Sequence, residues 1–253
     1  MRALDLFSGI GGFALAGRMV WGDDYQVQAF CEIEPFCQKV LKKHWPDVPI
    51  ETDIKSMDGK KYAGTIDLIT GGFPCQDISA ASTTRTGLQG ERSGLWWRMF
   101  EIISQIRPRF ILLENSSELL YRGVGDILQA MAKIGYDSEW HCLPAAYVGA
   151  PHIRDRAWIL SYPTGLGWPN LGKELQTINV LENVWEWRQN TEDFIQRNHA
   201  PDEYQGDPEL IRIGDGLSAE MDRIKSLGNA IVPQVAAQFM RAIKNPTEME
   251  ATQ

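Results

Sequence analysis

Apolar and polar positions alternate along the first 162 residues in a pattern that predicts strands separated by helices. Helical periodicity occupies residues 13–20 and 36–45, and Pro46 breaks the second of these runs. Strands that alternate with helices indicate an α/β fold with a parallel sheet covered on both faces. The short apolar runs that predict the strands are residues 3–7, 27–31, 66–70, 110–113 and 157–160.

The pattern changes after residue 162, where frequent Gly, Pro, Asn and Trp residues interrupt the alternation of strands and helices. We therefore expect two domains. Residues 1–162 and 227–253 form a main domain, and residues 163–226 form a small, irregular one. Residues 245–253 have the composition of a frayed C-terminal tail.

The composition is that of an ordinary globular protein. The chain has 253 residues, of which 43% are hydrophobic and 23% charged, which excludes disordered and fibrous classes. A chain of this length buries roughly 70 to 75% of its unfolded surface, so it folds without disulfides or structural metal. The four cysteines include no C-x-x-C pair and no histidine at metal-ligand spacing, so we expect free thiols and no metal.

Charge and hydropathy limit the kinds of partner that the chain is expected to bind. No stretch approaches the roughly 20 apolar residues of a membrane span, so we expect a cytoplasmic monomer without a membrane partner. The net charge of −8 is unfavourable for nucleic-acid binding, because phosphate contacts need local positive charge. Residues 81–110 nevertheless hold five arginines against two acidic side chains, so a surface for a polyanion is expected there.

A glycine loop follows the first predicted strand. Residues 9–14 match the pattern G-x-G-x-x-A, and Glu32 follows about twenty residues later at the end of the next strand. Such glycines let the backbone approach a ligand, and a carboxylate at a strand end can accept both ribose hydroxyls. The alternative is a glycine turn that only connects a strand to a helix. If the loop binds a cofactor, NAD and S-adenosylmethionine both remain open.

Two reactive side chains are predicted at the same edge of the sheet. Cys75 lies in a glycine-rich turn directly after the strand at 66–70, where backbone N–H groups could stabilise a thiolate. Its alternative role is that of a small buried hydrophobic residue. Glu114 ends the strand at 110–113, and burial there would raise its pKa and make it a proton donor. Its alternative role is a helix-capping acid, because residues 115–117 also read as a helix start.

A further polar cluster, Arg154-Asp155-Arg156, precedes the last predicted strand. Two arginines beside an acid can form an ordinary surface salt bridge, which contributes little to stability.

Five motifs of the chain together resemble the cytosine-C5 DNA methyltransferase family. They occur in the order that this family shows and extend from residue 5 to residue 233. The motifs are DLFSGIGG at 5–12 for the cofactor, GFPCQ at 72–76 with Ser79 for the nucleophile, EN at 114–115 for the carboxyl, RDR at 154–156 for the arginines and LGNAIVP at 227–233 for the return to the cofactor pocket.

This resemblance implies a Rossmann-like, S-adenosylmethionine-dependent methyltransferase fold that carries a small target-recognition domain. It implies that Cys75 attacks C6 of a flipped-out cytosine, Glu114 protonates N3 and Arg156 holds the base at O2, with Arg154 as a further catalytic residue. The methyl group then passes to C5. Double-stranded DNA is the implied substrate, a cognate restriction endonuclease is a candidate partner, and a bacterial or phage-infected cell is the implied host.

The resemblance also assigns the binding residues. The implied cofactor-binding residues are Phe7, Gly9, Ile10, Gly11, Gly12, Glu32, Ile33, Asp53, Ile54, Pro74, Leu95, Asn229 and Ala230. Within this set Glu32 would bind the ribose, Asp53 the adenine amino group, and Ile33 and Ile54 the two faces of the adenine ring. The implied DNA-binding residues are Gln76, Ser79, Arg85 and Arg92, within a segment at 77–93 expected to close over DNA.

The chain departs from the family pattern in two places. Ser116 stands where the family usually has valine, and residues 207–222 are only a loose counterpart of the motif that precedes the C-terminal one. Residues 161–210 also hold three basic against nine acidic side chains, which is unusual for a region that reads DNA. The alternatives are an RNA cytosine methyltransferase of the same fold, a DNA-binding protein on an inactive methyltransferase fold and an NAD-dependent oxidoreductase.

Overall fold

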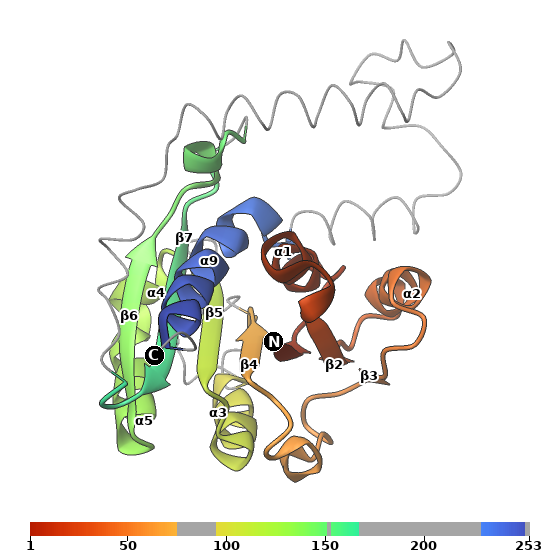
Figure 1. Cartoon of the computed structure of the whole chain (residues 1–253), viewed down its shortest axis with the longest axis horizontal. Coiled ribbons are helices and arrows are strands. Elements are labelled where there is room, and N and C mark those ends of the chain that lie inside the picture. Colours follow the sequence, from red (N-terminus) through yellow and green to blue (C-terminus); the bar gives the residue numbers. More distant parts are fainter. Residues whose placement is uncertain (75–94, 151–152, 167–228, 251–253) are drawn as a thin grey trace.

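Seven strands form one sheet at the centre of the protein, in the order β3-β2-β1-β4-β5-β7-β6 (Figure 1). The computed structural model describes residues 1–74, 95–150, 153–166 and 229–250, with the backbone alone for residues 245–250. The strands are β1 (Arg2–Leu6), β2 (Gln26–Cys31), β3 (Ile50–Glu51), β4 (Leu68–Gly71), β5 (Phe110–Ser116), β6 (Tyr136–Cys142) and β7 (Arg156–Pro163).

Helices cover both faces of this sheet. Figure 1 shows α1 and α9 side by side over one face, and these two helices are in contact. The opposite face packs against α3 and α5. The helices are α1 (Gly12–Trp21), α2 (Pro35–His44), α3 (Leu95–Ile106), α4 (Leu119–Arg122), α5 (Val124–Lys133) and α9 (Pro233–Glu250), with short 3-10 turns η1 (Gly22–Asp24), η2 (Gly59–Tyr62) and η4 (Ala145–Val148).

Alternation along each strand divides the core into two layers. In β1, Leu4 and Leu6 pack with the buried side chains of α3 and α5, whereas Ala3 packs with those of α1 and α9. Successive side chains of a strand point to opposite faces, so a strand buried on both faces reads as a continuous apolar run. The apolar runs of the sequence therefore predicted β1, β2, β4, β5 and β7 correctly, within a few residues at each end.

The expected α/β architecture is confirmed, but the expectation of a wholly parallel sheet is wrong at one end. The five strands from β3 to β5 are parallel, while β7 pairs antiparallel with both β5 and β6. The described part of the connection from β6 to β7 contains only η4, and a parallel pair needs a longer crossover. The tail expected at residues 245–253 is also wrong in part, because α9 continues to Glu250.

The topology brings the carboxyl ends of β1, β2, β4 and β5 to one edge of the sheet. Open α/β sheets bind ligands at this edge, next to the strand where the order reverses. Here the order reverses between β1 and β4, which are the strands that precede the glycine loop and the turn at 72–74.

Two further expectations concern the whole chain. Within the described residues no helix is both long enough and apolar enough to cross a membrane. Cys31, Cys37 and Cys142 are free thiols, whereas Cys75 lies outside the described residues.

Candidate active site

The loop that follows β1 is tied to β2 by a serine. The Ser8 hydroxyl donates to the Asp5 carbonyl at 2.6 Å and accepts the Cys31 N–H at 3.2 Å. Phe7, directly before Ser8, has a φ of 56°, which a side chain with a Cβ rarely adopts. Such strain costs of order 1 to 3 kcal/mol and concentrates at functional sites.

Glycine is required in this loop by close contacts. A Cβ on Gly11 would lie 2.5 Å from the Trp45 ring, and Gly11 also has a φ of 88°. A Cβ on Gly12 would lie 2.6 Å from the Ile231 side chain. The second contact means that the glycine loop and the approach to α9, which are more than 200 residues apart, pack directly against each other.

Glu32 fixes the loop from the end of β2. One carboxylate oxygen accepts the Gly9 N–H at 2.7 Å, and the other accepts the Glu34 N–H at 2.8 Å. The Glu32 side chain is 8% exposed. Each carboxylate oxygen can accept a second hydrogen bond, so Glu32 can still receive ribose hydroxyls. We call the loop at 7–12 together with Glu32 the cofactor half of the site.

The three predicted adenine contacts lie beyond this loop. Asp53 accepts the Lys55 N–H at 2.9 Å on one carboxylate oxygen. Ile54 is 4% exposed and belongs to the core against α3, whereas Ile33 is 63% exposed. That Ile33 and Ile54 bind the two faces of an adenine ring stays a prediction.

Glu114 lies within β5, and its carboxylate is close to the side chain of an arginine on the neighbouring strand β7. Arg156 Nε is 3.1 Å from the Glu114 carboxylate, and Glu114 pairs with Trp158 in the sheet register. Because β5 extends to Ser116, Glu114 is not at the start of a helix, and the helix-capping alternative is wrong. Glu114 is 8% exposed, so the ion pair also differs from a surface salt bridge.

The pKa of Glu114 is raised above its ordinary value because burial penalises the charged carboxylate. The positive charge of Arg156, that of Arg154 and the hydrogen bond from Arg156 oppose this effect. A raised pKa favours the protonated acid, as a proton donor requires. The environment therefore suits the role predicted for Glu114.

The turn before the predicted nucleophile is held against β5. The Asn115 side-chain amide donates to the Phe73 carbonyl at 3.0 Å, and Asn115 is 3% exposed. A Cβ on Gly72 would lie 3.1 Å from the Glu114 carboxylate. The turn at 72–74 therefore passes directly beside Glu114. Cys75 follows Pro74 in the chain but lies outside the described residues. We call this turn, Glu114 and Arg156 the base half.

One pocket connects the two halves. It is lined from the cofactor half by the loop residues and from the base half by Gly72 and Glu114, and the C-terminal motif closes it. Its lining residues are Phe7, Ser8, Gly9, Ile10, Gly12, Phe13, Gly72, Glu114, Asn229, Ala230 and Ile231. At about 40 Å³ this pocket is too small to hold a cofactor and a base, so it marks the point at which the two halves meet.

A larger cavity of about 900 Å³ adjoins this pocket between α1, α2 and the start of α9. Its described lining is mainly apolar, with Leu15, Val40 and Trp45 among its members, and includes no carboxylate. The larger cavity alone has the volume of a ligand site, and the smaller pocket alone places Glu114 beside the glycine loop.

The C-terminal motif is attached to the arginine motif. Arg154 Nη2 donates to the Ala230 carbonyl at 2.6 Å, and Arg154 has a φ of 35°. Sequence reasoning placed Arg154 with the catalytic groups. In the structure Arg154 also lines the larger cavity and anchors Ala230, a contact over 76 positions that local patterns do not reveal.

The remaining predicted residues lie partly inside and partly outside the described part of the chain. Inside it, Leu95 is the first residue of α3 and packs against the core, and Pro74 is partly buried. No group of three or more His, Cys, Asp or Glu in the described residues is arranged to hold a metal ion. The predicted residues that lie outside the described part are Cys75, Gln76, Ser79, Arg85 and Arg92, and the small domain at 163–226 is described only as far as residue 166.

Comparisons with known proteins agree with this geometry. "Type II methyltransferase M2.BsuMI" of Bacillus subtilis (strain 168) is 34% identical over 169 residues, which are 64% of this chain and 42% of the relative. "Type II methyltransferase M.Sau3AI" of Staphylococcus aureus is 28% identical over 220 residues, which are 79% of this chain and 53% of the relative. The matched part is thus about half the length of these relatives.

Solved structures share the fold. The S. pombe Dnmt2 methyltransferase superposes with a TM-score of 0.60 at 19% identity, over 71% of this chain and 56% of that one. This likeness confirms the expected Rossmann-like methyltransferase fold. The model of the C-5 cytosine-specific DNA methylase family matches residues 1–212. The chain therefore belongs to the C-5 cytosine-specific DNA methylase family.

Proposed function

We propose that the protein transfers a methyl group from S-adenosylmethionine to C5 of a cytosine flipped out of double-stranded DNA. The observation that carries this proposal is the shared pocket, in which the glycine loop and Glu114 face a common space. A methyl donor and an acceptor base need this adjacency. A nicotinamide-dependent oxidoreductase would leave Glu114 and Arg156 without a task.

The residues of the cofactor half suit S-adenosylmethionine. Glu32 offers a buried carboxylate to two hydroxyls, and Gly9 has open space where a side chain would stand. Asn229 and Ala230 close the pocket at the end where we place the amino-acid part of the cofactor. When bound there, S-adenosylmethionine supplies an electrophilic methyl group.

The base half performs the remaining chemistry. The Cys75 thiolate adds to C6, and the electron pair displaced from the C5–C6 double bond is stabilised as Glu114 gives a proton to N3. C5 thereby gains enamine character and takes the methyl group, with S-adenosylhomocysteine as the leaving group. The C5 proton then passes to water, which restores the C5–C6 double bond and expels the thiolate, while the N3 proton returns to Glu114. Arg156 holds the base at O2 while keeping Glu114 in place.

The remaining parts of the proposal concern DNA. Arg85 and Arg92 contact phosphates, Gln76 and Ser79 lie next to the nucleophile on the DNA side, and residues 163–226 select the target sequence. A cognate endonuclease would make the protein part of a restriction-modification system. We propose two domains on the same basis. The main domain comprises residues 1–162 and 227–253, and the small domain comprises residues 163–226.

Bisulfite sequencing of DNA from a methylation-free host that expresses the protein tests this function and reads the target sequence. We expect protected cytosines at one short recurring sequence, and none with Cys75→Ala. The purified protein is then given labelled S-adenosylmethionine with DNA or with transfer RNA. Methyl transfer to RNA alone would replace DNA by RNA as the substrate.

The covalent step has its own test. DNA with 5-fluorocytosine at the target should form an adduct that survives a denaturing gel, because fluorine cannot leave C5 as the proton does. Cys75→Ala is the matched control and should form none. An active enzyme that gives no adduct with this DNA would contradict the covalent mechanism.

A further inference from the structure

The loop between β3 and η2 contains two of the groups that the proposed function places against adenine. Asp53 and Ile54 stand at its start, and Asp58 caps η2 by accepting the Lys60 N–H at 3.0 Å. The bond between the Asp53 carboxylate and the Lys55 N–H is local to the loop. Such local bonds shape the loop but do not fix it to the rest of the protein.

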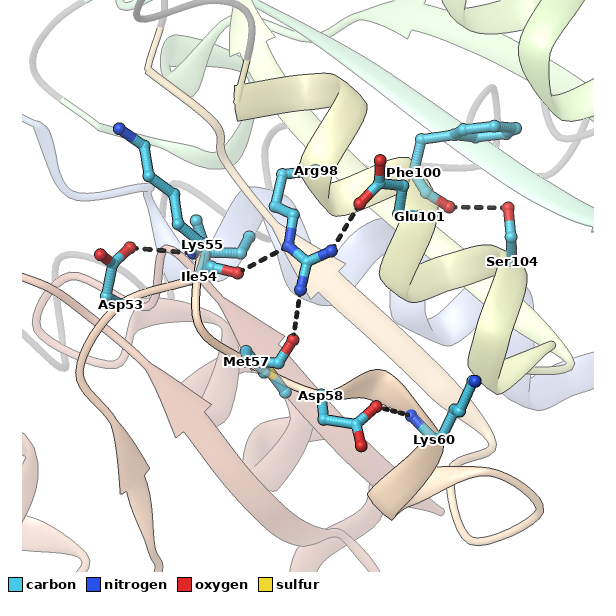
Figure 2. Close-up of polar contacts among 10 residues, drawn as sticks. All are labelled: Asp53, Ile54, Lys55, Met57, Asp58, Lys60, Arg98, Phe100, Glu101 and Ser104. Carbon is cyan, nitrogen blue, oxygen red and sulfur yellow. Dashed lines mark hydrogen bonds and ion pairs between the residues drawn. The ribbon is translucent and has the colours of Figure 1, made fainter.

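Arg98 of α3 makes the connection across to this loop, as Figure 2 shows. Its Nε donates to the Ile54 carbonyl at 3.1 Å, and its Nη2 donates to the Met57 carbonyl at 2.5 Å. Its Nη1 contacts Glu101 on the same helix at 2.5 Å. All three guanidinium nitrogens are thus engaged. The rigid, planar fork of arginine suits two carbonyls that lysine, a point donor, could not hold together.

The loop is anchored on α3 at both ends. The Ile54 and Met57 side chains are 4% and 1% exposed, and both belong to the core beneath α3. At the far end, a Cβ on Gly59 would lie 3.2 Å from the Ile102 Cα. The hydrophobic anchors fix where the loop lies, but they do not fix how its peptide groups are rotated.

That rotation is decided at one peptide unit. The carbonyl of Ile54 and the N–H of Lys55 belong to the same planar peptide group. Arg98 holds the carbonyl side of this plane, and the N–H side donates to the Asp53 carboxylate. The orientation of the Asp53 carboxylate is therefore linked through one rigid unit to the guanidinium of Arg98.

We propose that Arg98 is a positioning residue that orients Asp53 toward the adenine amino group of the cofactor. The proposal rests on the proposed function, because it takes Asp53 as the group that reads adenine. Without Arg98 the peptide plane can rotate, and the Asp53 carboxylate loses its fixed direction. The cofactor site then keeps its shape but loses its selectivity for the 6-amino group.

The test measures binding by calorimetry with S-adenosylhomocysteine and with S-inosylhomocysteine, which has an oxygen in place of the amino group. We expect wild type to bind the adenine compound roughly tenfold more tightly, the value of one good hydrogen bond to a charged group. Arg98→Ala should remove this preference. The turnover rate at saturating cofactor should stay within about twofold of wild type, while KM for the cofactor rises.

A double-mutant cycle isolates the link between Arg98 and Asp53. Asp53→Ala should weaken binding of the adenine compound by roughly tenfold in the wild-type background and have almost no effect in the Arg98→Ala background. Residues that act through one another show such non-additivity, whereas independent residues add. Arg98→Lys, which keeps the charge, should retain part of the preference and serves if Arg98→Ala fails to fold.

Arg107 provides a matched control from the same helical segment. Arg107, directly after α3, donates to the Ile134 carbonyl and lies 5.1 Å from the Tyr136 ring, but it does not contact the loop at 53–58. Arg107→Ala should lower the melting temperature and leave the adenine preference intact. Glu101→Gln should likewise leave the preference intact, because it keeps both carbonyl contacts of Arg98.

The possible results separate the two proposals. If wild type fails to bind S-adenosylhomocysteine, the proposed function itself fails. If wild type binds and prefers adenine, but Arg98→Ala keeps that preference and the effects of the cycle add, the positioning role of Arg98 is overturned. An equal loss of preference in Arg107→Ala would show a general loss of packing and would also overturn it.

Discussion

The two halves of the site hold equally buried glutamates in opposite ways. Glu32 and Glu114 are each 8% exposed and lie at the same edge of the sheet. Glu32 accepts two backbone N–H groups, from Gly9 and Glu34. Glu114 faces the Arg156 side chain at 3.1 Å, and burial still raises its pKa.

The difference lies in what each partner can do. A backbone amide cannot change its charge, and its position is set by the turn to which it belongs, so both Glu32 oxygens accept from donors that are fixed in place. An arginine side chain can contact a bound base and the carboxyl together, and burial still favours the protonated, proton-donating form of Glu114. The same residue type can thus serve as ligand holder in one half and as acid in the other, because environments set the roles of paired carboxylates.

The largest expected effect comes from replacing the Glu114 carboxyl, which is the proton donor proposed for the base half. Glu114→Gln keeps the shape of the side chain but cannot give a proton to N3, so turnover should fall by roughly 10² to 10⁴, the usual contribution of a positioned acid. Affinity for S-adenosylhomocysteine should change little. Steady-state kinetics and calorimetry on the same preparation measure both quantities. Intact turnover with weakened cofactor binding would move Glu114 into the cofactor half.

The reverse pattern is expected in the cofactor half. Glu32→Gln can accept only one of the two backbone N–H groups, because its amide nitrogen would face the other as a second donor. Cofactor affinity should fall roughly 10- to 100-fold, as expected for one or two charge-assisted hydrogen bonds. Turnover at saturating cofactor should remain within a few fold of wild type. A large loss of turnover at saturation would show that the two halves are not separable.

A smaller effect is expected from weakening the ion pair itself. Arg156→Lys keeps the charge but loses the fixed planar donor, so turnover should fall by no more than roughly tenfold. The attraction of Arg156 lowers the pKa of Glu114, and weakening it raises that pKa further. Since Glu114 must be protonated to act, the alkaline decline of turnover should begin at a higher pH. Glu32→Gln is the control, whose decline should begin where that of wild type does.

Much of the cofactor half could be predicted from local sequence. The apolar run of β1, the glycines that follow it and Glu32 at the end of β2 lie close together in the chain, and their spacing reflects helix and strand periods. Contacts over long separations could not be predicted. Arg98 reaches the Ile54 carbonyl across 44 positions, and no pattern near either residue marks that contact.

The base half was predictable in its residues but less so in its geometry. Glu114 was correctly placed at a strand of the sheet, yet the chain beyond it read as a helix start and instead continues as strand to Ser116. The pairing of β5 with the antiparallel strand β7 extends it, and strand pairing depends on partners elsewhere in the chain. The strand β6 was missed for a related reason. It is an edge strand, and its polar residues leave no apolar run from which a strand could be predicted.

A third buried carboxyl sharpens the comparison between the halves. Asp5, in β1 beneath the glycine loop, is fully buried, and one of its oxygens accepts the Thr70 hydroxyl at 2.8 Å. The other oxygen has no hydrogen-bond partner among the described residues. With neither two amides nor an arginine beside it, burial raises the pKa of Asp5 to about 7.

The last prediction concerns stability and not turnover, as a pH-dependent difference between Asp5→Asn and wild type. The pKa of Asp5 rises from 3.8 to about 7 on folding, so its contribution to stability is full below the lower value and is lost as pH rises through the upper one. Wild type should therefore lose stability between about pH 5 and pH 8 relative to Asp5→Asn, by roughly 3 kcal/mol, since about two pH units separate pH 5 from the folded pKa. Urea unfolding at both pH values measures this difference.

Asp67→Asn is the matched control. Arg2 holds the pKa of Asp67 below its usual value, so the effect of this substitution on stability should be constant over the same pH range. A constant difference for Asp5→Asn as well would mean that Asp5 does not change its protonation state over this range.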